Sequence, residues 1–379
     1  MKKHFLFSSF WIAALFLVLS VAAQAQTMPL YTRWENFTTT NGMPDDKVFA
    51  VAVDSDRVWA GTENGLVLIE QGKISKIFKP ADGLANRVVT GVAIDPGTHD
   101  VWLSTFGGVS RLSGGQFQNY TNMTSGLAND IVYGIAVQDQ FVWAATTAGI
   151  SRLNTISGEW TIFSERNSPM HEPWSYGIAV GEGKVYAAVW GGGMLEYDLA
   201  TGNWKPYNDP DGELEIVLFQ NQGLIHDIVS SVAYNRQTKM LWASTYFGLS
   251  GYDGRNWHNY LSTDSGLASD FINAAQSRGD DVWACTDQGL SYLNFKTNTW
   301  VTYRPDAQSG RGEILIKAPG QEVRKLESPT TLAHNYILNL TFQGQDIWVA
   351  TAKGLSHGFI ESTSTNTEGK IHERKSSSR

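Results

Sequence analysis

Cysteine is nearly absent from this sequence, which contains a single one, Cys285, among 379 residues. A disulfide bond within the chain is therefore excluded, even in an oxidising compartment. Cys285 lies in a segment whose counterparts elsewhere in the chain carry serine or alanine. We expect its side chain to fill space in the core.

Long apolar runs are missing after the first two dozen residues. The chain opens with Lys2 and Lys3, continues with an apolar run over residues 5–23 and then reads Ala-Gln-Ala-Gln. This pattern is typical of a secretory signal peptide, so we assign residues 1–26 to one and exclude them from the fold. No later apolar run approaches the length of about 18 residues that a membrane helix requires. We therefore expect no membrane span and a periplasmic or secreted mature protein.

Basic residues are scarce, since 29 lysines and arginines stand against 37 aspartates and glutamates, a net charge of −8. The signal peptide holds two of the lysines, and residues 361–379 hold four basic and three acidic residues, so the part between them carries about −11. Nucleic acids and anionic membranes bind basic surfaces, which argues against both as partners. Residues 361–379 are polar apart from Ile371, and this composition predicts a disordered tail.

What the sequence does contain is a repeat built on tryptophan. The pattern is Trp, two residues, Thr, two residues, Gly and an aliphatic residue, with copies that begin at Trp59, Trp102, Trp143, Trp242, Trp283 and Trp348 and a degraded copy at Tyr186. The anchors lie 43, 41, 43, 56, 41 and 65 residues apart. A β-rich repeat with a period in the low forties is typical of a propeller blade, so seven copies predict seven blades.

Each repeat divides into four strands, which alternate apolar and polar residues between clusters of Gly, Asn and Asp. In the second repeat we expect strands over 88–94, 101–105, 109–112 and 117–120. Residues 32–38 resemble an outer strand that lacks inner strands before it, and the last copy lacks an outer strand after residues 355–360. We therefore predict an all-β fold over residues 27–360: a seven-bladed β-propeller with four antiparallel strands per blade, closed by pairing of the N-terminal strand with the C-terminal strands.

A second motif precedes the tryptophan motif and reads GLANRVV from Gly83, GLANDIV from Gly126 and GLASDFI from Gly266. The two motifs together resemble the repeat of the two-component regulator propeller family, over roughly residues 31–360. The resemblance implies a periplasmic ligand-sensing propeller, commonly the sensing part of a membrane histidine kinase and often a receptor for carbohydrate fragments. No membrane helix, immunoglobulin-like domain or kinase follows in this sequence. We therefore expect a stand-alone binding module.

Polar residues precede the innermost strand of each blade, where the repeat geometry should arrange them around the mouth of the central channel. We take as candidate ligand-binding residues Asp46, Arg87, Asp130, Glu172, His226, Asp227, Asp270, His334 and Asn335. The alternative is structural, because Asp and Asn after a turn often bond nearby backbone N–H groups.

Aromatic residues add to this candidate site. Phe106, Trp190 and Tyr246 lie in turns between the second and third strands, on the same face, and Trp174 lies at the entry of the fourth blade. That blade has lost its tryptophan anchor, and a departure from the local rules is expected at a functional site. Aromatic faces beside carboxylates and amides suit sugars. We predict a non-catalytic module that binds an oligosaccharide or another small polar ligand; a decayed blade refilled by tryptophan is the alternative.

Two other functions remain open at this point. A propeller enzyme of the lyase or lactonase type would use His171 with Glu172, or His226 with Asp227, as acid and base. A scaffold for an envelope protein would use the insertions 208–222 and 304–330, which we expect on the face where the inner strands start. We expect no cofactor; a hydrated Ca²⁺ held by carboxylates in the channel is the one metal hypothesis.

Overall fold

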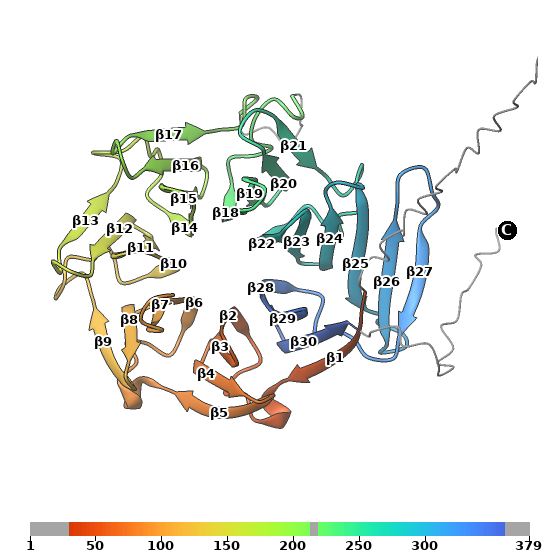
Figure 1. Ribbon diagram of the computed structural model, residues 1–379, viewed down its shortest axis with the longest axis horizontal. Coiled ribbons are helices and arrows are strands. Elements are labelled where there is room, and N and C mark those ends of the chain that lie inside the picture. The colour runs from red at the N-terminus through yellow and green to blue at the C-terminus, as the bar shows by residue number, and fades with distance from the viewer. Residues whose placement is uncertain (1–29, 213–218, 361–379) are drawn as a thin grey trace, which may run out of the picture. The chain divides into compact units, whose positions relative to one another are not determined.

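The computed structural model describes residues 30–212 and 219–360, so the predicted signal peptide and the predicted tail lie outside the described residues. The described residues form seven antiparallel sheets arranged as blades around a central axis (Figure 1). The inner strands of successive blades contact one another around the whole ring, and that of blade seven contacts that of blade one. The predicted all-β, seven-bladed propeller is confirmed.

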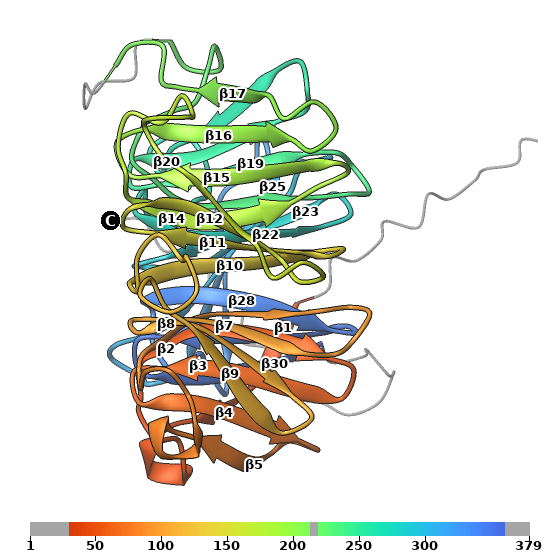
Figure 2. The ribbon, with the colours of Figure 1, turned by 90° about the vertical axis from the view of Figure 1, so that its left-hand side faces the viewer.

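Four strands per blade follow one another outward from the axis, as Figures 1 and 2 show. The inner strands are β2 (Val48–Asp54), β6 (Val89–Ile94), β10 (Val132–Gln138), β14 (Ser175–Val180), β18 (Val229–Tyr234), β22 (Ile272–Arg278) and β28 (Ile337–Gln343). The second strands are β3 (Arg57–Thr62), β7 (Val101–Thr105), β11 (Phe141–Thr146), β15 (Lys184–Val189), β19 (Leu241–Thr245), β23 (Asp281–Thr286) and β29 (Asp346–Thr351).

The third strands are β4 (Gly65–Glu70), β8 (Gly108–Ser113), β12 (Gly149–Asn154), β16 (Gly193–Asp198), β20 (Gly248–Tyr252), β24 (Gly289–Asn294) and β30 (Gly354–Ile360). The outer strands are β5 (Lys73–Phe78), β9 (Gln116–Tyr120), β13 (Trp160–Phe163), β17 (Trp204–Tyr207), β21 (Trp257–Tyr260), β25 (Thr299–Pro305) and β1 (Tyr31–Phe37). Two short 3₁₀ helices, η1 (Thr39–Asn41) and η2 (Pro80–Asp82), follow β1 and β5. Among the described residues, no helix is long and apolar enough to cross a membrane.

The repeated tryptophans and threonines are architectural. Trp102 is buried between blades two and three and stacks on Tyr120 with a centroid distance of 5.8 Å. The hydroxyl of Thr105 donates to the carbonyl of Gly108 at 2.7 Å and accepts the N–H of Gly107 at 3.0 Å, which fixes the tight turn between the second and third strands. The corresponding threonines of the other blades with the full motif repeat the first of these bonds.

The ring is closed as predicted, because β1 pairs with β30 from Tyr31 opposite Ile360 to Phe37 opposite Leu355. β1 is therefore the outer strand of blade seven, although it comes first in the chain. Trp34 and Phe37 are buried by this pairing, and Phe37 packs on Trp348 with ring centroids 5.6 Å apart.

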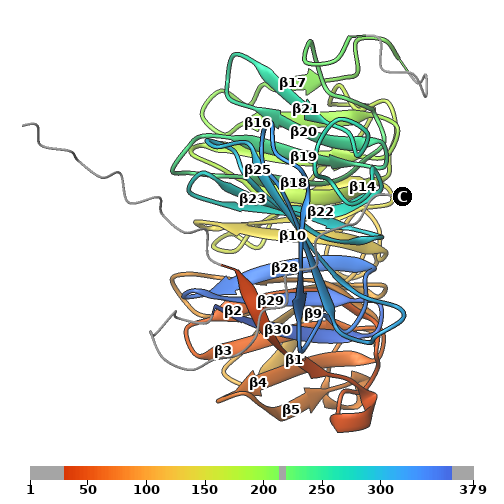
Figure 3. The same cartoon turned by 90° about the vertical axis from the view of Figure 1, so that its right-hand side faces the viewer.

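The insertion at 304–330 differs from the loop expected on the face where the inner strands start. Its central part forms the hairpin β26 (Gly312–Lys317) and β27 (Arg324–Ser328), which continues the sheet of blade six outward from β25. Figure 1 shows this hairpin on the outer side of the ring, on the side that faces the viewer in Figure 3. The hydroxyl of Thr330 accepts the N–H of Trp34 at 2.7 Å, and Ser328 donates to the carbonyl of Thr32, so the insertion also braces the closing strand.

Candidate ligand site at the channel mouth

The inner strands enclose a cavity of about 820 Å³ at the centre of the ring, called the channel cavity below. Residues from all seven inner strands line it, and Phe106 and Tyr246 reach it from turns between second and third strands. Glycines in the inner strands of blades three and four let each strand approach the next closely: a Cβ on Gly134 would lie 2.8 Å from the carbonyl oxygen of Tyr176, and one on Gly177 would lie 3.1 Å from Cα of Ser231.

Every inner strand begins with a β-bulge. The register shifts, for example, between Val132 and Gly134 in β10 and between Ser175 and Gly177 in β14, and the five other inner strands shift at the equivalent place. A bulge leaves one residue unpaired and re-aims its side chain. The seven bulge residues all line the channel cavity: Phe49, Thr90, Tyr133, Tyr176, Ser230, Asn273 and Leu338.

The polar bulge residues also join neighbouring blades. The hydroxyl of Thr90 donates to the carbonyl of Val132 at 2.6 Å, and that of Ser230 donates to the carbonyl of Ile272 at 2.6 Å. The amide of Asn273 donates to the carbonyl of Ile337 at 2.7 Å. These bonds hold the inner strands together around the cavity wall.

Seven aromatic rings form a continuous series around the mouth of the channel cavity, called the aromatic arc below. It runs from blade two to blade seven in the order Phe106, Tyr133, Tyr176, Trp190, Tyr246, Phe271 and Tyr336, with successive centroids 5.6, 4.5, 5.1, 4.9, 3.7 and 6.3 Å apart. All but Trp190 and Phe271 line the cavity itself. Such an arc presents ring faces, ring edges and phenolic hydroxyls to the same space.

The tyrosine hydroxyls of the arc are close enough to influence one another. Burial raises the pKa of Tyr176 to about 12, and the hydroxyls of Tyr133 and Tyr246 add to that shift. Burial likewise raises the pKa of Tyr246, with further contributions from Tyr336 and Tyr133. The hydroxyls of Tyr176 and Tyr246 stay protonated at neutral pH, so each can both donate and accept a hydrogen bond to a ligand.

The four predicted aspartates lie just before the inner strands, and their side chains bond the backbone of the preceding loops. Oδ1 of Asp46 accepts the N–H of Thr39 at 2.6 Å, and Oδ1 of Asp130 accepts that of Asn122 at 2.7 Å. Asp227 does the same for Asp209 at 2.8 Å, and Asp270 for Ser262 at 2.6 Å. None of the four lines the channel cavity in the described part of the chain. A role in ligand binding stays a prediction for them.

The predicted nitrogen-bearing side chains lie near the same entries. Nη1 of Arg87 donates to the carbonyl of Glu63 at 2.8 Å. Nδ1 of His226 accepts the N–H of Ile228 at 3.0 Å, and its ring is buried against Phe247 with centroids 4.0 Å apart. Nδ1 of His334 accepts the N–H of Tyr336 at 3.0 Å, and burial and Lys353 lower the pKa of His334. Asn335, its neighbour, is half-buried.

The two predicted tryptophans of blade four lie in different environments. Trp190 is part of the aromatic arc, whereas Trp174 is 48% exposed, and its carbonyl accepts the N–H of Trp190 at 2.9 Å. His171 and Glu172, proposed above as an acid–base pair, are exposed at the start of this blade. In the described part of the chain, neither they nor His226 with Asp227 line the channel cavity.

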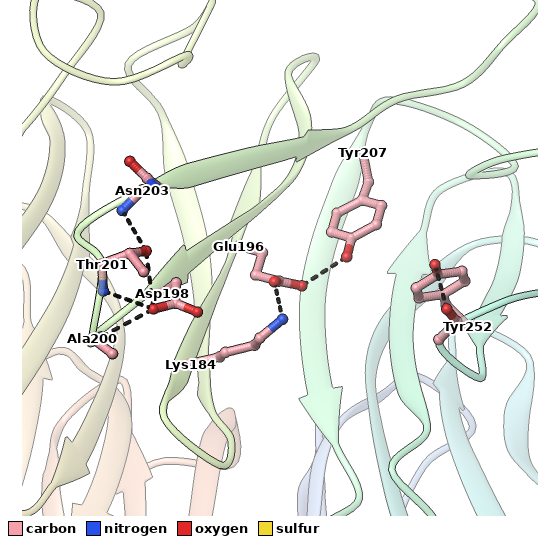
Figure 4. A network of polar contacts seen from close by, with 9 residues as sticks. Lys184, Glu196, Asp198, Ala200, Thr201, Asn203, Tyr207 and Tyr252 are labelled. Carbon is pink, nitrogen blue, oxygen red and sulfur yellow. Dashed lines mark hydrogen bonds and ion pairs between the residues drawn. The ribbon is translucent and has the colours of Figure 1, made fainter.

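The lost tryptophan of blade four is replaced by a polar network. The ammonium group of Lys184 pairs with the buried carboxylate of Glu196, whose Oε2 accepts the hydroxyl of Tyr207 at 2.7 Å (Figure 4). Tyr186 occupies the tryptophan position and stacks on Tyr234 of blade five at 5.4 Å. The refilled core of this blade is thus partly polar, and the network is structural.

A metal site gains no support from the described residues, where no three His, Cys, Asp or Glu side chains come together as ligands. The members of the aromatic arc that the sequence analysis missed are Tyr133, Tyr176, Phe271 and Tyr336. Comparing the repeats at the positions directly before and at the start of each inner strand would have found them, because aromatic residues recur there from blade to blade.

No family model and no curated protein match the sequence. Solved structures do match. The extracellular domain of a putative hybrid two-component system of B. thetaiotaomicron is 16% identical, with a TM-score of 0.65 over 87% of this chain and 42% of that one. The extracellular domain of a putative one-component system of the same organism is 18% identical, with a TM-score of 0.62 over 88% and 40%.

A third match is virginiamycin B lyase from Staphylococcus aureus, 15% identical, with a TM-score of 0.60 over 86% of this chain and 98% of the lyase. The chain spans less than half the length of the two B. thetaiotaomicron domains. At these identities the similarity concerns the fold. The chain is a seven-bladed β-propeller of the same fold as part of the extracellular domains of these putative two- and one-component systems, in line with its resemblance to two-component regulator propellers.

Proposed function

We propose that this chain is a ligand-binding propeller that receives a small polar ligand, of the oligosaccharide class, in the channel cavity. The observation that carries the proposal is the aromatic arc around a cavity of about 820 Å³. Ligand pockets commonly have volumes of about 300–1,000 Å³. This cavity is large enough for an oligosaccharide fragment.

The chemistry of the cavity wall supports a sugar. Sugar rings offer C–H faces that pack on aromatic rings and hydroxyls that form directional hydrogen bonds. Tyr133, Tyr176, Tyr246 and Tyr336 supply both kinds of contact, and aliphatic residues such as Val51 and Ile135 line the wall between them. Trp174 and the entry carboxylates would extend this site to the outer rim.

The cellular location of the protein is part of the same proposal. The sequence of residues 1–26 is typical of a secretory signal, and the two matched B. thetaiotaomicron structures are extracellular domains. A periplasmic or secreted propeller with a saccharide site would serve as the sensing or capturing module of an envelope system. Its partner would then be an envelope protein that recognises the ligand-bound form of the propeller.

Calorimetric titration against a panel of oligosaccharides tests the proposal. Tyr246→Ala should remove a stacking surface and lower affinity for the bound sugar by about tenfold or more. Tyr246→Phe keeps the ring and is the matched control, expected to lose only the contribution of the hydroxyl. Trp174→Ala shows whether the site reaches the rim. Absence of binding to every sugar, or equal binding by wild type and Tyr246→Ala, would contradict the proposal.

A further inference from the structure

One residue of the channel cavity differs in kind from the rest of the wall. Among the described residues that line the cavity, Lys47 is the single charged side chain; the others are aromatic, aliphatic, hydroxyl- or amide-bearing, or glycine. Lys47 is exposed and directly precedes β2, and its ammonium group lies 4.9 Å from the ring centroid of Phe49, which also lines the cavity. A cation therefore faces an otherwise uncharged binding space.

Lys47 has no carboxylate partner among the ion pairs of the described residues. Some less exposed cations elsewhere in the chain do have one, as Arg111 has Asp100. The two acidic neighbours of Lys47 are bound to backbone instead. Oδ1 of Asp45 accepts the N–H of Lys47 itself at 3.0 Å, and Oδ1 of Asp46 accepts that of Thr39.

The blade that carries Lys47 lies between the two ends of the aromatic arc. The arc starts at Phe106 in blade two and ends at Tyr336 in blade seven. Blade one lies between these two blades in the ring, since β2 contacts both β6 and β28. Lys47 and Tyr336 hold the same place in their repeats, directly before a buried residue of the inner strand. A ligand stacked against either end of the arc would therefore lie next to the blade that carries Lys47.

We infer that Lys47 makes the channel cavity selective for anionic saccharides, whose carboxylate or sulfate group pairs with its ammonium. This inference rests on the proposed sugar site. A ligand that fills the cavity displaces water from the ammonium group, and a neutral ligand gives no opposite charge in return. An acidic group restores that interaction through a charge-assisted hydrogen bond, while the rest of the sugar keeps its contacts with the arc.

The test compares matched acidic and neutral sugars on the full protein. A glycan array and calorimetry would use two kinds of matched pair: oligogalacturonate with its methyl ester, which removes the charge, and sulfated forms of neutral oligosaccharides with their unsulfated parents. Wild type should bind the acidic member of a pair about tenfold more tightly. The preference should shrink as ionic strength rises, because salt screens the pair. Carboxylate and sulfate arms show which acid is preferred.

Lys47→Met should equalise the two members of each pair, because it removes both the partner of the acidic group and the cost of desolvating an ammonium group beside a neutral sugar. Lys76→Met is the matched control, because its ammonium group lies over Phe78 in the same way, at 4.5 Å, but on the exposed outer strand β5 of the same blade. That variant should keep the wild-type preference. Unchanged melting temperatures would confirm that both variants fold.

Two different failures remain distinguishable. If sugars bind and Tyr246→Ala weakens them, but acidic and neutral members bind wild type equally, the inference about Lys47 is wrong and the sugar site stands. The inference is also wrong if Lys47→Met keeps the acidic preference. If no member of the array binds, the proposed function fails, and the inference fails with it.

Discussion

The backbone N–H of Tyr31 donates to the hydroxyl of Tyr303 at 3.5 Å, across 272 residues of sequence. Tyr31 begins the closing strand β1 in blade seven, and Tyr303 lies on β25 in blade six. Their rings are 6.2 Å apart, and the ring of Tyr31 also packs edge-on against Trp283 at 5.5 Å. The seam between the last two blades is therefore made by a residue from the start of the chain.

Removal of residues 31–39 should strongly destabilise the propeller. The deletion eliminates β1 and exposes the surface that Tyr31, Trp34 and Phe37 cover, and each buried aromatic side chain is worth about 1.5–3 kcal/mol. We expect a fall in melting temperature of about 5–10 °C, with aggregation through the uncovered edge of β30. Differential scanning calorimetry measures the melting temperature. Removal of residues 361–379 is the control, and we expect it to leave the melting temperature unchanged. An unaltered melting temperature after the first deletion would show that β1 does not close the ring.

Glu196→Ala should destabilise blade four by about 1–3 kcal/mol, because it leaves the Tyr207 hydroxyl and the Lys184 ammonium without their shared acceptor. Urea unfolding measures the change in the free energy of unfolding. Glu182→Ala is the control: its pair with Lys239, at 3.4 Å, is exposed on both sides and should contribute less than about 0.5 kcal/mol. Equal effects of the two substitutions would refute the structural role of the Glu196 network.

Alkaline pH should weaken the fold through Tyr176. Its pKa in the folded state is raised to about 12 by burial, with contributions from Tyr133 and Tyr246, whereas an unfolded tyrosine ionises near pH 10. The folded state thus holds its proton more tightly, so this contribution to stability is complete below about pH 10 and is lost as the pH rises toward 12. Unfolding at a series of pH values should show a shallower decline in Tyr176→Phe than in wild type. If the stability of wild type and of Tyr176→Phe declines equally with rising pH, Tyr176 is not the group responsible.

A second pH dependence should occur near neutrality, at Asp209 after β17. Its side chain is buried, which raises the pKa to about 7, with help from a hydrogen bond to the carboxyl of Asp211. An unfolded aspartate ionises near pH 4, so the folded state holds more protons between about pH 4 and 7 and stability falls across that range. Asp209→Asn should flatten this slope and stabilise the protein at pH 8 by on the order of 1 kcal/mol.

Asn at 209 keeps the Oδ1 that accepts the N–H of Asp211 at 3.1 Å, so the local turn is preserved. Thermal unfolding of wild type and variant at about pH 5 and pH 8 measures the slope. If both proteins lose the same stability over this interval, Asp209 is not the group responsible.

The aromatic arc shows where the sequence ceased to be informative. Phe106, Trp190 and Tyr246 could be found because each lies in a turn at the same distance from the anchor of its repeat, which is Trp102, Tyr186 and Trp242 respectively. Tyr133 and Tyr176 read instead as ordinary members of alternating strands, for which side-chain direction follows from parity. The bulge at the start of each inner strand breaks that parity and turns these side chains into the cavity. A bulge depends on the neighbouring strand, so the residues of one strand do not reveal it.

The insertion at 304–330 shows the same limit. Its apolar residues, such as Ile314 and Ile316, indicated an ordered segment, but not that β26 would pair with β25 and extend blade six outward. Whether an insertion pairs with a sheet edge or covers a face depends on which edge is free, and that is a property of the assembled ring.

The sequence by itself determined the number of blades, their strand order and the place where the ring closes. Each of these follows from a local pattern that recurs about every 42 residues, and from the unmatched outer strand at residues 32–38. The tertiary structure alone decided which side chains share the channel cavity. Asp46 and Lys47 are adjacent in sequence, yet Asp46 bonds the loop before it while Lys47 lines the cavity, because the chain bends at Asp46 before it enters β2.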